Sequence, residues 1–168
     1  MDRVLASVAI AGATVKTVSL SVTCTSPASV DSIPGTYLPT ECGLMATRVY
    51  GFDGDLGTTM TSVDHELMAT GWTDTGPSMI SQLAEWHVAG PADGLIAVVY
   101  RSVNPGDAWT AAIGWAQHPE PLLPNCQHEY HTVVIQRSCV DLAGVLRSIL
   151  AGRLYAMEFT VGEGYYPG

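Results

Sequence analysis

The densest group of chemically active side chains lies between residues 126 and 141. It contains two thiols, two imidazoles and a carboxylate: Cys126, His128, His131, Cys139 and Asp141. Thiolate and imidazole are the ligands that zinc prefers, and a structural zinc site needs four ligands in tetrahedral reach. The spacing C-x-H-x-x-H-x7-C fits no zinc-finger or HExxH pattern, and in a strand His128 and His131 would point to opposite faces. We therefore expect no bound metal and no other cofactor.

The same residues could act as a nucleophile and its base. Cys126 or Cys139 would attack after a histidine had taken its proton, and Asp141 would orient the imidazole. Cys139 is the better thiol, because we place it at the start of a helix, where thiolate is stabilised. The competing interpretation is structural, since free cysteine is among the most buried residue types. We expect four reduced, mostly buried thiols, although the pairs Cys24–Cys42 and Cys126–Cys139 would each close a short disulfide loop.

Carboxylates gather in the middle of the chain, where no basic residue occurs between Arg48 and Arg101. Oxygen and nitrogen ligands for Ca²⁺ or Mg²⁺ are present there in Asp53, Asp55, Asp64, His65 and Glu66. The EF-hand spacing and its terminal glutamate are missing. We interpret this stretch as a solvated acidic face, and the alternative is a docking surface for a basic partner.

Four tryptophans are the remaining side chains of interest: Trp72, Trp86, Trp109 and Trp115. Small-molecule pockets are mostly apolar with a few polar groups, so tryptophans could line one. Aromatic side chains also dominate cores and interfaces. Trp109 and Trp115 are six residues apart on one predicted strand and therefore share a face, either inside the fold or against a partner.

The composition leaves few charges to coat the surface. Hydrophobic residues make up 47% of the 168-residue chain and charged residues only 14%, against about 25% in typical soluble domains. Large exposed apolar patches usually mark interaction sites, so we expect a protein partner or a homo-oligomer. The net charge is −9 and Lys16 is the single lysine, which excludes nucleic acid as a direct ligand.

The apolar run at residues 4–13 is too short to cross a bilayer, which needs about 20 residues. It is also a poor secretory signal, because Asp2 offsets the charge of Arg3. We expect no membrane association and a cytoplasmic or virion-associated protein.

Hydrophobic periodicity and turn residues predict the elements that must position these side chains. Strands are expected at 15–24, 44–52, 57–63, 95–100, 108–117, 129–137 and 153–161, with an additional strand at 3–10 as an alternative. Asp53-Gly54-Asp55 would join the second and third strands as a hairpin, and 95–100 would be buried on both faces near the sheet centre. Helices are expected at 77–88 and 139–150, the second capped by Ser138 and ended by Gly152.

This order favours a single α+β domain over residues 1–168, with a mostly antiparallel sheet of about 7–9 strands and two helices packed on one face. The long stretch from Thr25 to Gly43 is a candidate functional loop. Low charge and the lack of a catalytic signature favour a non-enzymatic assembly or interaction protein, such as a phage or viral particle component or an inhibitor-like partner. The alternative is a small enzyme or ligand-binding domain with a Cys/His site around residues 118–139.

Overall fold

The computed structural model describes residues 2–25, 41–89, 96–104, 109–117, 123, 126 and 133–165. Six strands lie in this part of the chain: β1 (Thr14–Thr25), β2 (Glu41–Phe52), β3 (Trp72–Asp74), β4 (Ile96–Ser102), β5 (Trp109–Gln117) and β6 (Tyr155–Tyr165). The helices described are α1 (Asp2–Leu5), α2 (Leu56–Ala69), α3 (Met79–Ala89) and α4 (Val133–Leu150). The predicted α+β class is confirmed, and the strands number six among the described residues rather than seven to nine.

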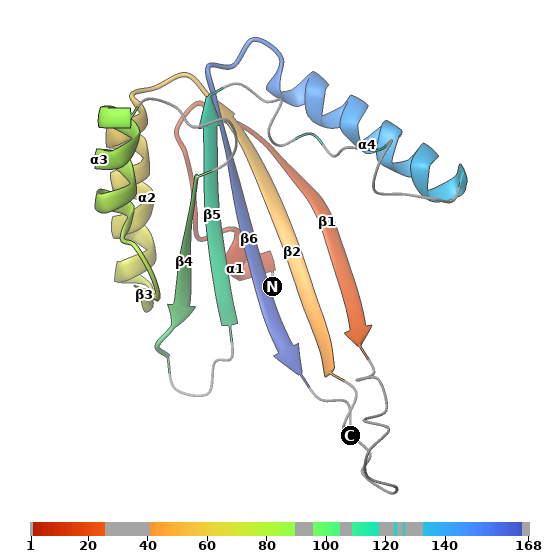
Figure 1. Ribbon diagram of the computed structural model, residues 1–168, viewed down its shortest axis with the longest axis horizontal. Coiled ribbons are helices and arrows are strands. Elements are labelled where there is room, and N and C mark those ends of the chain that lie inside the picture. The colour runs from red at the N-terminus through yellow and green to blue at the C-terminus, as the bar shows by residue number, and fades with distance from the viewer. Residues whose placement is uncertain are drawn as a thin grey trace, which may run out of the picture.

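All six strands belong to one antiparallel sheet in the order β1-β2-β6-β5-β4-β3. Strand β6 follows the others in the sequence but lies between β2 and β5 (Figure 1). Val161 on β6 faces Ala46 on one side and Ala111 on the other. The middle of the sheet is therefore built from segments that are far apart in the chain.

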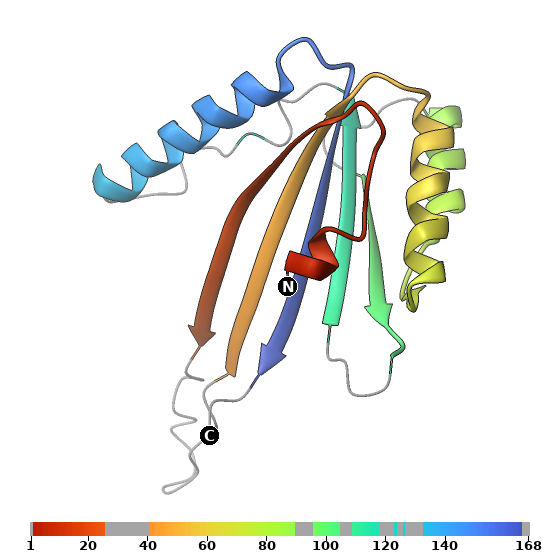
Figure 2. The same ribbon diagram turned by 180° about the vertical axis from the view of Figure 1, so that it is seen from behind.

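Helices pack on both faces of the sheet. The main core lies on the face covered by α1, α2 and α3, where Tyr50, Trp115 and Phe159 are fully buried. A smaller cluster lies on the other face, where Leu146 and Leu150 of α4 contact Val49 and Ala156. Figures 1 and 2 show α2 and α3 side by side near β4, while α4 extends outward past β1. The predicted helices 77–88 and 139–150 both exist, but they lie on opposite faces and not on one.

The predicted hairpin around Asp53-Gly54-Asp55 is wrong, because residues 56–69 form α2. Asp55 starts the helix as its N-cap, accepting a hydrogen bond from the Thr58 amide at 2.7 Å. The buried residues of α2 recur at helical spacing: Leu56, Met60, Val63 and Leu67. Aspartate is common both in tight turns and at helix N-caps, and here the period of the following apolar residues decides between them.

The predicted strand at 129–137 is also wrong over its described part, because α4 begins at Val133. Residues 129–132 lie outside the described residues. Ser138 is inside the helix, so it is not the N-cap. The predicted end of the helix is confirmed by Gly152, whose φ of 75° is the left-handed conformation that glycine adopts most readily.

Two strand predictions differ in outcome. The strand expected at 153–161 is β6, on which the alternating residues Met157, Phe159 and Val161 are fully buried and Tyr155 is partly buried. Strand β4 is not buried on both faces, because Val98 and Tyr100 are buried while Val99 is exposed. It lies next to the short edge strand β3 rather than at the sheet centre. The N-terminal segment forms the one-turn helix α1 in place of a strand, and no described helix is long and apolar enough to span a bilayer.

Candidate functional site

The predicted Cys/His cluster contains a disulfide. Cys126 and Cys139 are joined, with a Cα–Cα distance of 5.6 Å, and the bond attaches α4 to the segment before it. Both cysteines are buried beside Ala143. His128 and His131 lie outside the described residues. A sulfur held in a disulfide is not a thiolate, so chemistry at Cys126 or Cys139 would first require reduction.

Asp141, the predicted orienting carboxylate, is exposed on α4, whereas Cys139 is buried. Residues two apart on a helix do not face each other, so these side chains do not form a pair. Among the described residues, no three His, Cys, Asp or Glu side chains are grouped closely enough to hold a metal ion.

The expectation of reduced thiols is wrong for three of the four cysteines. Cys42 is disulfide-bonded as well, and the backbone of Cys24 lies directly opposite it in the β1–β2 ladder. The length and the apolar content of the chain suggested that the fold needs no disulfide bonds. The register of two long strands, which places these positions side by side, is not visible in composition.

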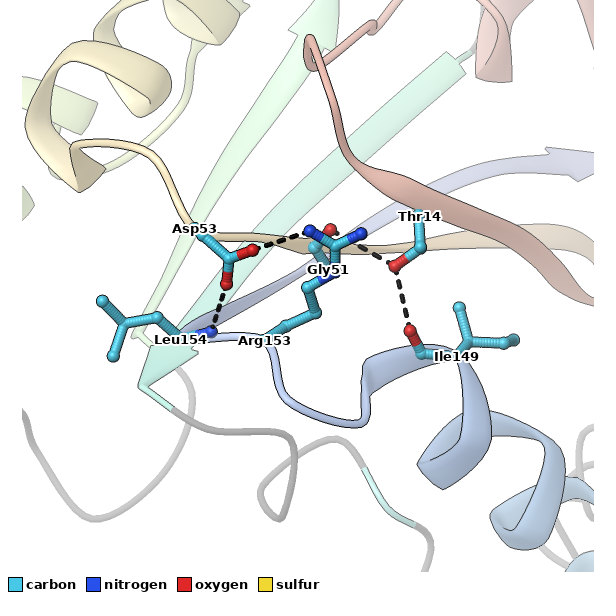
Figure 3. Close-up of polar contacts among 6 residues, drawn as sticks. All are labelled: Thr14, Gly51, Asp53, Ile149, Arg153 and Leu154. Atoms are coloured by element: carbon cyan, nitrogen blue, oxygen red, sulfur yellow. Dashed lines mark hydrogen bonds and ion pairs between the residues drawn. The ribbon is translucent and has the colours of Figure 1, made fainter.

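The acidic residues from Asp53 onward do not converge on one site. Asp53 accepts hydrogen bonds from the Leu154 amide at 2.8 Å and from the Arg153 guanidinium at 2.6 Å (Figure 3). The Leu154 amide and then Arg153 lower the pKa of Asp53. The hydrogen bond from Thr58 likewise lowers the pKa of Asp55. Both carboxylates therefore accept hydrogen bonds that hold local structure.

A separate acidic group lies between α2 and the β3–β4 edge. The phenol of Tyr100 donates to Asp64 at 2.9 Å, and Asp74 is opposite Tyr100 in the β3–β4 register. One carboxylate oxygen of Asp74 is buried without a described hydrogen-bond partner. Burial, followed by repulsion from Asp64, raises the pKa of Asp74. Sequence reasoning missed this group because its members are distant in the chain and only pairing of β3 with β4 brings them together.

A wide apolar surface lies on the sheet face opposite the main core. We call it the open sheet face, and it comprises Met45, Thr47, Val99, Thr110, Ala112, Thr160 and Gly162. Met45 and Val99 are exposed by 48% and 46%. A shallow groove of about 320 Å³ runs over it, and no described helix lies across this groove.

The groove keeps its shape because Gly162 has no side chain. A Cβ at this position would lie 3.4 Å from Met45 Cγ and 3.6 Å from the Leu44 carbonyl oxygen. The hydroxyls of Thr47 and Thr160 hydrogen-bond to each other at 2.9 Å, which reduces the polarity of this surface. The result is a flat, largely apolar surface.

A second concave site, the tryptophan pocket, has a volume of about 500 Å³ and lies on the opposite side of the sheet. It is lined by Val4, Ser7, Thr70, Trp72, Ser102, Asn104 and Trp109. Two of the four predicted pocket tryptophans therefore do line a pocket. Trp86 and Trp115 instead pack against each other in the core, with ring centroids 6.5 Å apart.

Comparisons with known proteins assign none of these sites, because no protein-family model, no curated protein and no solved structure matches this chain.

Proposed function

We propose that this protein is a non-enzymatic interaction protein that assembles with a second copy of itself through the open sheet face. The observation that carries the proposal is the pair of nearly half-exposed side chains, Met45 and Val99, on the part of this sheet face that no described helix covers. Exposed apolar patches of this kind usually mark interaction sites. An inhibitor-like protein or a component of a phage or viral particle would use such a surface in the same way.

The charges around the open sheet face favour a second copy over a basic partner. Register places Lys16 and Glu158 opposite Val49, and Arg101 opposite Thr110, so all three side chains belong to this face. A surface that carries both signs around a neutral centre can be complementary to itself, as a two-fold interface requires. A basic partner would be attracted to a surface with acidic side chains alone.

We further infer that the protein functions in an oxidising compartment, which disfavours the cytoplasm among the two locations, cytoplasmic or virion-associated, that the sequence suggested. The support is the disulfide between Cys126 and Cys139 together with the disulfide-bonded state of Cys42. Structural disulfides persist in secreted and periplasmic proteins and on virion surfaces, and they are rare in the cytosol.

The mass of the protein in solution tests the assembly proposal. Light scattering across a concentration series should give twice the 17.8 kDa chain mass, and the variants Met45→Glu and Val99→Glu should shift the protein to the monomer. Ile80→Glu is the matched control, because Ile80 is an equally apolar and even more exposed residue on α3. A monomeric wild type at every concentration would overturn the proposal, as would a dimer that survives both substitutions.

A further inference from the structure

The tryptophan pocket is independent of the proposed dimer surface, because Trp109 lies on the core side of β5 whereas Thr110 belongs to the open sheet face. The pocket lies where the ends of β3, β4 and β5 meet the N-terminal segment. Its volume of about 500 Å³ falls within the range of small-molecule sites, roughly 300–1,000 Å³.

The N-terminal wall of the pocket is fixed to the sheet by long side chains. Arg48 donates to the Leu5 carbonyl at 3.0 Å, and the phenol of Tyr50 donates to the Val8 carbonyl at 2.9 Å. Ser7, which lies between these two anchor points, lines the pocket. The wall is therefore formed before a ligand arrives, and a preformed site avoids the entropic cost of ordering.

The opposite wall is fixed by Asn104. Its side-chain nitrogen donates to the Thr70 carbonyl at 3.3 Å and to the Ser102 hydroxyl at 3.4 Å. The Asn104 side chain fits in this place because residue 71 is a glycine. Gly71 has a φ of 91°, and a Cβ there would lie 2.6 Å from the Asn104 Oδ1 atom. Any larger residue at 71 would displace the asparagine.

The polar atoms of the lining are mainly acceptors. The hydroxyl proton of Ser7 is donated to the Val4 carbonyl, and that of Thr70 to carbonyls of the preceding helical turn. Each hydroxyl oxygen keeps lone pairs. No described residue donates a hydrogen bond to the Oδ1 atom of Asn104. The described side chains of the lining are all uncharged, and Trp109 is only partly buried.

We propose that the tryptophan pocket binds a neutral, hydroxyl-bearing ring, of which a pyranose sugar is the simplest class. The C–H face of such a ring packs on indole, and its hydroxyl protons meet the acceptors of Ser7, Thr70 and Asn104. A charged ligand would lose its hydration without gaining an opposite charge. A purely apolar ligand would bury these acceptors without partners, which carries the full desolvation penalty.

Four probes with the same ring test this assignment by saturation-transfer NMR on the intact protein. They are methyl glucopyranoside and methyl galactopyranoside as sugars, methyl glucuronide as the charged analogue, and tetrahydropyran as the analogue without hydroxyls. We expect the neutral glycosides alone to give transfer at about 10 mM, a concentration that would fill most of a weak site with a Kd near 1 mM. No transfer from either glycoside, or a stronger signal from the glucuronide or tetrahydropyran, would overturn the proposal.

Pocket variants locate the binding. Asn104→Ala and Ser7→Ala should each weaken glycoside binding about tenfold, the effect of about 1.4 kcal/mol. Trp109→Ala should abolish it, and circular dichroism identifies any variant that fails to fold. Ile80→Ala is the control for a surface substitution and should bind as wild type does. Unchanged binding in folded Asn104→Ala and Ser7→Ala proteins would place the sugar elsewhere and refute the assignment.

Discussion

Asp64, Asp74 and Tyr100 bring two carboxylates and a phenol together where α2 meets the β3–β4 edge. Asp64 accepts a hydrogen bond from the phenol of Tyr100. By contrast, one of the carboxylate oxygens of Asp74 is buried without a described partner. The folded state therefore disfavours the charge on Asp74, which is the physical meaning of its raised pKa.

Because the pKa of Asp74 is raised in the folded state, the stability of the protein depends on pH. A carboxyl whose pKa is higher in the folded state than in the unfolded state stabilises the fold below the unfolded pKa, and this contribution is lost as pH rises through the folded pKa. We expect Asp74→Asn to raise the melting temperature at pH 7, by about 2–4 °C for each kcal/mol gained in a chain of this size. The variant should also remove part of the loss of stability above pH 4.

Calorimetry between pH 3 and pH 8 measures this effect. Glu85→Gln removes an exposed carboxylate on α3 and controls for the change in net charge. An Asp74→Asn protein that melts below wild type at pH 7 would show that the carboxylate is stabilising and that our sign is wrong.

At the scale of elements, α4 depends on a close approach at its C-terminal end. Thr14 on β1 donates to the Ile149 carbonyl at 2.9 Å, and Asp53 holds Arg153 and Leu154 just beyond the helix (Figure 3). Gly51 lies beneath them. A Cβ at Gly51 would lie 2.8 Å from Leu150 Cδ2 and 2.9 Å from Thr14 Oγ1.

We therefore expect Gly51→Ala to separate α4 from the sheet. Overpacking of this kind costs about 1–3 kcal/mol, which urea denaturation can measure. Gly144→Ala is the control, because a Cβ at Gly144 on α4 meets no atom within 4 Å and alanine favours a helix. Equal stabilities for wild type and Gly51→Ala would mean that the helix end adjusts without cost.

Elements with regular apolar spacing could be predicted from sequence, and those that begin at ambiguous polar residues could not. The alternation of β6 and the apolar stripe of α4 up to Gly152 were visible because each period has one structural explanation. Asp55 was ambiguous, because aspartate serves equally in a turn and as an N-cap. Of the tryptophan pocket, only the tryptophans could be predicted from the sequence as lining residues. Gly71 and Asn104 could not, because neither belongs to a periodic pattern.

At the scale of the whole molecule, the Cys126–Cys139 disulfide controls how firmly α4 is attached. The two cysteines are 13 residues apart, and closing a loop of about this length is worth about 3 kcal/mol in the chain-entropy account. The double variant Cys126→Ser/Cys139→Ser should lose about that much in the free energy of unfolding. Adding reductant should cost wild-type protein more stability than it costs the variant, because the variant retains only the disulfide of Cys42.

Thiol titration of unfolded wild-type protein provides the independent check on the oxidised state. Free thiols at Cys126 and Cys139 in protein recovered from an oxidising compartment would contradict the disulfide. They would also contradict the oxidising compartment that we infer.

The position of β6 has a consequence for how the chain is made. Until residues 155–165 leave the ribosome, β2 and β5 have no common neighbour, so the nascent protein holds two partial sheets that cannot join. A translation product that stops before Tyr155 should remain open and prone to aggregation, because both partial sheets present unpaired edges. The complete six-stranded sheet of the described residues therefore forms only after β6 has been synthesised.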